Sequence, residues 1–157
     1  MRVEDSFVVD APIERVWAYI TNPDEVAPCL PGCESVEVTG PKSYKASVKL
    51  AMGPIKTVFQ VTVEVTAEEP PTFASSVTRG EEGGRASSLV AHNELRLATM
   101  ADGKTEVRYA SDVSIFGRLG KFGLGMMKKR AATTGSDFAK AFTARVEAAS
   151  ALAETQT

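Results

Sequence analysis

The sequence predicts one α+β domain, in which a curved antiparallel sheet of six to seven strands packs against a long C-terminal helix. Three observations carry this prediction. The middle of the chain alternates apolar and polar residues, which is typical of an antiparallel sheet with one buried and one wetted face. Helical patterns flank that region, two short ones near the N-terminus and a long one after residue 118. A length of 157 residues suits one hydrophobic core.

The first elements of the chain are a strand and two short helices. Residues 2–9 alternate as a strand does, and residues 10–14 then form a helix start, with Asp10 as a cap and Pro12 with a preset φ. We expect this helix to end near Ile20. A second short helix is expected to begin at residues 22–24 and to stop before the Pro31-Gly32 turn.

The sheet strands follow one another with turn residues between them. The expected strands cover residues 35–39, 44–52, 57–65, 73–79, 87–99 and 104–115. The glycine-rich segment 80–84 is predicted as a turn and not as a phosphate loop, because no helix follows it and two acids lie where an anion would bind.

The last element is a helix from residue 118 to about residue 153, followed by a frayed tail over 154–157. Its two apolar stripes do not coincide, and residues 134–137 between them are a natural kink point. A kinked helix over a curved sheet leaves room for a ligand. The basic run at residues 128–130 is predicted to be a solvated face, with docking to anionic lipid or an acidic partner as the alternative.

Composition excludes several classes of function. The chain is 43% hydrophobic and 24% charged, and its formal net charge of −2 gives no basic field to hold nucleic acid. No apolar run approaches the roughly 20 residues needed to cross a bilayer, and acids stand at Glu4 and Asp5 where a signal peptide would be basic. We therefore expect a cytoplasmic protein with no nucleic-acid partner.

The residues that could do covalent chemistry are few. Cys29, Cys33 and the single histidine, His92, are too few for a tetrahedral zinc site, and His92 is expected on the outer face of its strand. The cysteines are expected to be thiols in a reducing cytoplasm, and their spacing is not that of a Cys-x-x-Cys motif. The sequence thus predicts no catalytic and no metal site.

Two stretches near the N-terminus resemble a known family. Residues 9–17 contain the Ala-Pro-x-Glu-x-Val-Trp start that is common to the START-like superfamily of polyketide cyclases and lipid-transfer domains. Residues 29–34, Cys-Leu-Pro-Gly-Cys-Glu, are more characteristic of the carbon monoxide dehydrogenase G-subunit family. Further similar segments are residues 68–71, 83–84, 111–113 and 117–119. The resemblance covers nearly the full chain.

The resemblance implies a helix-grip (START-like) fold over residues 1–153, with a deep apolar cavity between sheet and helix. It also implies an accessory role to molybdenum-containing carbon monoxide dehydrogenases or related hydroxylases, in recruitment to the inner membrane or in carrying electrons on a bound quinone. No covalently bound cofactor is expected. Many members continue past the last helix with a tail thought to reach the membrane, and this sequence ends at Thr157, so peripheral membrane contact is left open.

The predicted ligand-binding residues are apolar, apart from two with a polar group. Asn93 is expected to face inward among apolar neighbours and so to need a hydrogen bond from backbone, water or a ligand carbonyl, and Tyr109 offers the same choice. The full predicted set is Leu30, Pro31, Leu50, Met52, Phe59, Val61, Asn93, Leu95, Tyr109, Phe122, Met126, Phe138 and Phe142. Two alternatives to a quinone or lipid carrier are a small cyclase-like or aromatase-like enzyme and a protein-interaction module with a filled core.

Overall fold

The computed structural model describes residues 1–52, 54–83, 87–117 and 124–156. The elements follow the order β, α, α, six strands, α, with a short 3-10 turn at Ala27–Cys29 after the second helix. Their bounds are β1 Arg2–Val9, α1 Ile13–Ile20, α2 Pro23–Val26, β2 Cys33–Gly40, β3 Ser43–Met52, β4 Ile55–Glu69, β5 Phe73–Glu82, β6 Ser87–Thr99, β7 Thr105–Gly117 and α3 Leu124–Gln156.

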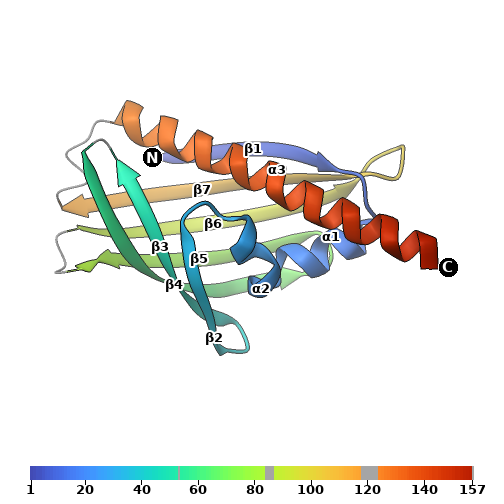
Figure 1. The fold of residues 1–157 in the computed structure, drawn as a ribbon, viewed down its shortest axis with the longest axis horizontal. Coiled ribbons are helices and arrows are strands. Elements are labelled where there is room, and N and C mark those ends of the chain that lie inside the picture. The colour runs from blue at the N-terminus through green and yellow to red at the C-terminus, as the bar shows by residue number, and fades with distance from the viewer. Residues whose placement is uncertain (53, 84–86, 118–123, 157) are drawn as a thin grey trace.

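The strands form one sheet of seven in the order β1-β7-β6-β5-β4-β3-β2, and every neighbouring pair is antiparallel. Figure 1 shows β2, β3 and β4 running at a steep angle to β5, β6 and β7, so that the sheet curves. The long helix α3 crosses the same side of the sheet as α1 and α2. The predicted fold class, a curved antiparallel sheet with one long C-terminal helix, is confirmed.

The N-cap residues of the two short helices are Pro12 for α1 and Asn22 for α2. In α1 the N-cap residue is Pro12, one step before the first helical residue, and not Asp10 as the sequence suggested. The backbone N–H of Asp10 instead donates to Glu147 of α3 at 2.9 Å. The side chain of Asn22 caps α2 by accepting from the backbone N–H of Asp24 at 3.0 Å, which is the role expected of asparagine at this position.

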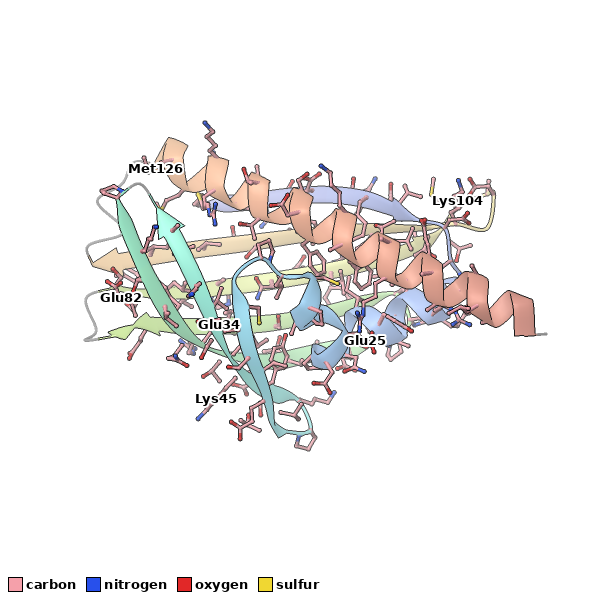
Figure 2. All side chains as sticks on the ribbon, viewed as in Figure 1. Glu25, Glu34, Lys45, Glu82, Lys104 and Met126 are labelled. Carbon is pink, nitrogen blue, oxygen red and sulfur yellow. The ribbon has the colours of Figure 1, made fainter. Side chains whose placement is uncertain are left out.

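Apolar side chains gather in two clusters under α3. The larger cluster fills the space between α1, the second half of α3 and strands β1, β6 and β7, and its buried members are Val9, Ala11, Val16, Cys29, Leu97, Val107, Phe142 and Val146. The smaller cluster pairs Phe59 with Met127, near the start of α3. Figure 2 shows the side chains on both faces of the sheet and places Met126 at this same start of α3.

Several element bounds differ from those expected. Strand β5 continues to Glu82, so residues 80–82 belong to a strand and not to the predicted turn. Helix α3 is continuous through the predicted kink point at 134–137 and extends to Gln156, past its expected end near residue 153 (Figure 1). The predicted helical residues 118–123 lie outside the described part of the chain.

The glycine at position 135 allows the side chain of Tyr109 to lie close to the backbone of α3. A Cβ atom built at Gly135 would collide with the hydroxyl of Tyr109, which comes from β7. A glycine in mid-helix lowers helix stability by about 1 kcal/mol relative to alanine, and here it allows the helix backbone to lie against the tyrosine. Within the described residues, no helix has both the length and the apolar character of a membrane span.

Candidate functional site

A pocket of about 200 Å³ lies between helices α1 and α2 and the inner face of the sheet. One wall comes from the end of α1 and from α2, with Ile20, Pro23 and Val26. The opposite wall comes from strands β3 to β7. Its members on the strands include Tyr44, Val63, Val65, Ser76, Asn93, Leu95, Tyr109 and Ser111.

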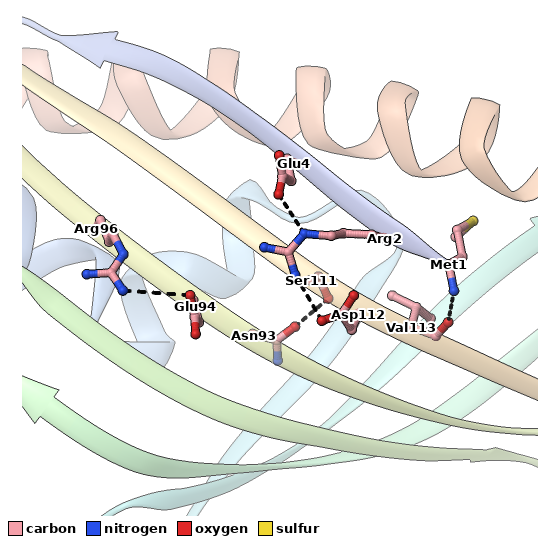
Figure 3. Close-up of polar contacts among 9 residues, drawn as sticks. All are labelled: Met1, Arg2, Glu4, Asn93, Glu94, Arg96, Ser111, Asp112 and Val113. Carbon is pink, nitrogen blue, oxygen red and sulfur yellow. Dashed lines mark hydrogen bonds and ion pairs between the residues drawn. The ribbon is translucent and has the colours of Figure 1, made fainter.

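Asn93 is the centre of a polar strip on this inner face. Its amide nitrogen donates to the hydroxyls of Ser76 at 3.2 Å and Thr78 at 3.0 Å, both on the neighbouring strand β5. Its amide oxygen accepts a hydrogen bond of 2.7 Å from Ser111 on β7 (Figure 3). The expectation that an inward Asn93 must find partners is confirmed, and the partners are hydroxyl groups on the two neighbouring strands.

This strip gives the pocket a defined polar side. Each hydroxyl keeps a free lone pair or proton after bonding to Asn93, since a hydroxyl has one donor and two acceptor positions. Ser76, Asn93 and Ser111 all line the pocket, while its other inward residues are mainly apolar. The arrangement can therefore hold an apolar molecule that carries a small number of hydrogen-bonding groups.

Tyr109 lies between the polar strip and helix α3. Burial, and secondarily the negative charge of Asp5 on the adjacent strand, raises the pKa of its phenol above the ordinary value. The phenol is therefore a proton-carrying donor at neutral pH and well above it. Because its hydroxyl also lies against Gly135, the position of this side chain depends on the position of α3.

The structure brings three of the predicted ligand-binding residues together in this pocket: Asn93, Leu95 and Tyr109. The others lie in different places. Phe142 is fully buried in the larger cluster, where Phe138 stacks on it with ring centroids 5.4 Å apart. Leu50, Phe59 and Val61 belong to the smaller cluster. Leu30 and Pro31 are half-buried and are not among the residues that line the pocket.

Met126 was expected to face inward, but it is 45% exposed, and its neighbour Met127, at 8% exposed, packs on Phe59 instead. The side chain of Met52 and the whole of Phe122 lie outside the described part of the structure.

The sequence prediction missed several pocket residues. Ile20, Val26 and Tyr44 come from segments that were predicted as helix or strand but not linked to a pocket. Ser76 and Ser111 were missed because serine carries no hydrophobic signal in a strand. The signal that could have found them is Asn93, since an inward amide needs partners on the flanking strands.

The carboxylates and thiols near the pocket are poorly placed for catalysis. Glu68 and Glu94, which line the pocket, are exposed residues that lie 4.0 Å from Lys42 and 3.8 Å from Arg96. Both cysteines are free, and burial raises the pKa of each thiol, so neither is activated as a thiolate at neutral pH. Among the described residues no group of three or more His, Cys, Asp or Glu side chains could hold a metal, and His92 is exposed.

Solved structures with this fold define the class to which the protein belongs. A conserved protein from Geobacillus kaustophilus superposes with a TM-score of 0.85 and 25% identity, covering 93% of this chain and 95% of that one. A START superfamily protein from Mycobacterium smegmatis superposes with a TM-score of 0.73 and 16% identity, covering 93% and 97%. The Zhui aromatase/cyclase from Streptomyces sp. R1128 gives 0.67 and 17%, covering 94% and 93%. The fold is thus the START-like fold.

The chain belongs to the carbon monoxide dehydrogenase G-subunit (CoxG) family, whose pattern it matches over residues 6–147. The predicted family is therefore confirmed. No curated protein matches the chain significantly.

Proposed function

We propose that this protein is a non-enzymatic carrier that binds a quinone or similar lipid and serves a molybdenum-containing carbon monoxide dehydrogenase or a related hydroxylase. The observation that carries the proposal is an inner pocket with apolar walls and one hydrogen-bonding strip, in a chain that belongs to the CoxG family. Its role is the recruitment of that enzyme or the delivery of electrons from it.

A quinone suits the chemistry of the lining residues. Its flat ring requires apolar walls, which Val63 and Leu95 provide. Its carbonyl oxygens require donors, which Tyr109 and the hydroxyl of Ser76 provide, because Ser76 accepts from Asn93 and keeps its own proton. The pocket volume of about 200 Å³ is below the usual 300–1,000 Å³ of small-molecule sites. It therefore suits a ring-sized group better than a whole lipid, and an isoprenoid tail would leave through the opening.

A cyclase-like enzyme is the alternative that shares this fold. Such an enzyme needs a base or acid held within reach of its substrate. Tyr109 is a protonated donor, and the two carboxylates that line the pocket belong to exposed residues with cationic neighbours. These features favour binding over catalysis. The third possibility, an interaction module without ligand, requires that the pocket stay empty.

The test is quinone uptake by the full chain and by a pocket-filling variant. Native mass spectrometry with organic extraction measures quinone retained by the purified protein or taken up on addition. Val63→Phe places extra volume in the pocket and should weaken uptake roughly tenfold, since overpacking costs about 1–3 kcal/mol. Val38→Phe is the matched control, because Val38 is 58% exposed on β2 and does not line the pocket.

The possible results separate the three functions. Uptake by the wild type and by Val38→Phe, but not by a folded Val63→Phe, supports a carrier. If the wild type neither carries nor takes up quinone or lipid, the carrier proposal is wrong. Co-purification with a carbon monoxide dehydrogenase tests the partner separately, and absence of any association would overturn the accessory role while leaving ligand binding intact.

A further inference from the structure

Three residues of the polar strip lie in one row across the sheet. Ser76 on β5 is paired with Asn93 on β6, and Asn93 is paired with Ser111 on β7. The residues at the two ends of this row are Val65 on β4 and Val3 on β1. Residues directly opposite each other in an antiparallel pair share a face of the sheet. The three polar side chains therefore point to the same side, and all three line the pocket of about 200 Å³ under α2.

The number of hydroxyls on each side of Asn93 determines the orientation of its amide. The amide nitrogen has two protons, and it donates them to Ser76 at 3.2 Å and Thr78 at 3.0 Å, both on β5. On the other side there is one hydroxyl, that of Ser111, which donates to the amide oxygen at 2.7 Å (Figure 3). The reverse orientation would offer two amide protons a single acceptor on β7. One proton would then be unpaired at a half-buried position, which is costly.

The two serines therefore offer different hydrogen-bonding groups to a ligand. Ser111 donates its one proton to Asn93, so only its lone pairs remain for the pocket. Ser76 accepts from Asn93 and keeps its own proton, for which the described part of the chain supplies no acceptor. The β5 side of the strip can thus donate to a ligand, whereas the β7 side can only accept from one.

This difference distinguishes the two redox forms of a quinone. The carbonyl oxygens of the oxidised form have no proton, so they can accept from Ser76 and Tyr109 but cannot donate to Ser111. The hydroquinone has a hydroxyl in place of each carbonyl, and a hydroxyl both accepts and donates. The reduced form can therefore use the same donors and also donate to Ser111. A carbonyl oxygen at Ser111 would leave lone pairs facing lone pairs.

We infer that the pocket binds the reduced, hydroxyl-bearing form of its quinone more tightly than the oxidised form. Ser111 accepts the hydrogen bond that only the reduced form can donate, and Asn93 is the positioning residue that directs the Ser111 proton away from the pocket. The inference rests on the proposed function, since it concerns the ligand of the same pocket.

The expected preference follows from one additional hydrogen bond, which corresponds to roughly tenfold in affinity. Tighter binding of the reduced form raises the midpoint potential of the bound couple above that of the free couple. For a two-electron couple, tenfold corresponds to about 30 mV. The bound quinone is therefore a better electron acceptor than the free quinone.

The experiment compares tetramethyl-1,4-benzoquinone with its hydroquinone, each titrated into the full chain by calorimetry without oxygen. The four methyl groups block addition of the free thiols of Cys29 and Cys33 to the ring. The wild type should bind the hydroquinone roughly tenfold more tightly than the quinone. The ratio of the two affinities is the readout, because a general loss of stability weakens both forms alike.

Three variants test which residues cause the preference. Ser111→Ala removes the acceptor, so its ratio of affinities should fall to about one. Asn93→Asp should widen the preference, because a carboxylate accepts from all the neighbouring hydroxyls and Ser76 then has no proton for the oxidised form. Ser114→Ala is the matched control, since Ser114 is exposed on β7 and does not line the pocket. Circular dichroism shows whether each variant is folded.

The possible results separate this inference from the proposed function. A preference for the hydroquinone that is kept in Ser114→Ala and lost in Ser111→Ala supports the inference. Equal binding of both forms by the wild type, or an unchanged preference in Ser111→Ala, overturns it and leaves the carrier function intact. If the wild type binds neither form, the carrier function and the inference are both wrong.

Discussion

The hydroxyl of Tyr109, on strand β7, lies directly against the backbone of helix α3 at Gly135. This contact joins the inner face of the sheet to the long helix. Tyr109 also lines the pocket under α2, so the position of the helix and the shape of the pocket are linked through one side chain. The glycine makes the contact possible, because a Cβ atom there would occupy the place of the hydroxyl.

Gly135→Ala should therefore change the pocket more than the stability. Alanine favours a helix over glycine by about 1 kcal/mol, which offsets the cost of displacing the end of the tyrosine side chain. We expect a change in the free energy of unfolding of less than about 1 kcal/mol, together with weaker uptake of quinone. Chemical denaturation and native mass spectrometry measure the two effects. Ser136→Ala, at an exposed neighbouring position, is the control. Unchanged uptake in Gly135→Ala would show that Tyr109 does not shape the pocket.

Phe142→Ala should be one of the most destabilising single changes in the chain. Phe142 is fully buried, stacks on Phe138 and contacts Phe7 edge-on with centroids 6.1 Å apart. Removal of a buried aromatic ring costs about 3–5 kcal/mol. Met126→Ala, at a side chain that is 45% exposed, should cost less than about 0.5 kcal/mol. Urea denaturation compares the two, and similar costs would show that the helix does not pack as described.

Features that depend on the residue pattern within a single strand were predicted correctly from the sequence. The alternation in residues 57–65 predicted the inward face of β4 correctly, with Phe59 buried there. Asn93 was placed inward by the same alternation, and its hydrogen bonds to β5 and β7 confirm that placement. In both cases the period of two within one strand was enough, because neighbouring residues of a strand point to opposite faces.

The failures concern contacts between distant segments. Gly135 was interpreted as a kink because its partner, Tyr109, is not visible from the helix sequence alone. Met126 and Met127 are adjacent and lie about 100° apart around the helix, so an error of one residue in the inward face of α3 exchanges the inward and the exposed residue. Ser76 and Thr78 lie in the segment Phe-Ala-Ser-Ser-Val-Thr, which has too little alternation to assign a face. Those positions are determined by tertiary packing.

Asn93→Ala should destabilise the protein by about 1–3 kcal/mol, although the change removes no large apolar group. The physical reason is that the three hydroxyls around Asn93 would lose their shared partner at a half-buried position. Thr66→Ala is the matched control, since the hydroxyls of Thr66 and Ser75 form an exposed hydrogen bond of 2.8 Å. Denaturation midpoints measure both. If the two variants lose the same stability, the strip is no more than a set of solvated contacts.

The stability of the folded chain should fall at alkaline pH, in part through Tyr44. Burial, and secondarily the charge of the Cys33 thiolate, raises the pKa of this phenol above its ordinary value of about 10. The folded state therefore holds the phenolic proton more tightly than the unfolded state. The resulting stability is fully present below about pH 10 and is lost as the pH rises through the raised pKa of the folded protein.

Tyr44→Phe tests this assignment, because it removes the proton and keeps the ring. Above about pH 10, the free energy of unfolding of the wild type should fall more steeply with pH than that of Tyr44→Phe. Lysine deprotonation affects both proteins alike, so the difference between the two curves isolates the phenol. The free energy of unfolding of Cys33→Ser should fall slightly less steeply with pH than that of the wild type, because the change removes the second cause of the raised Tyr44 pKa. Identical slopes for the wild type and Tyr44→Phe would show that the folded protein does not perturb this tyrosine.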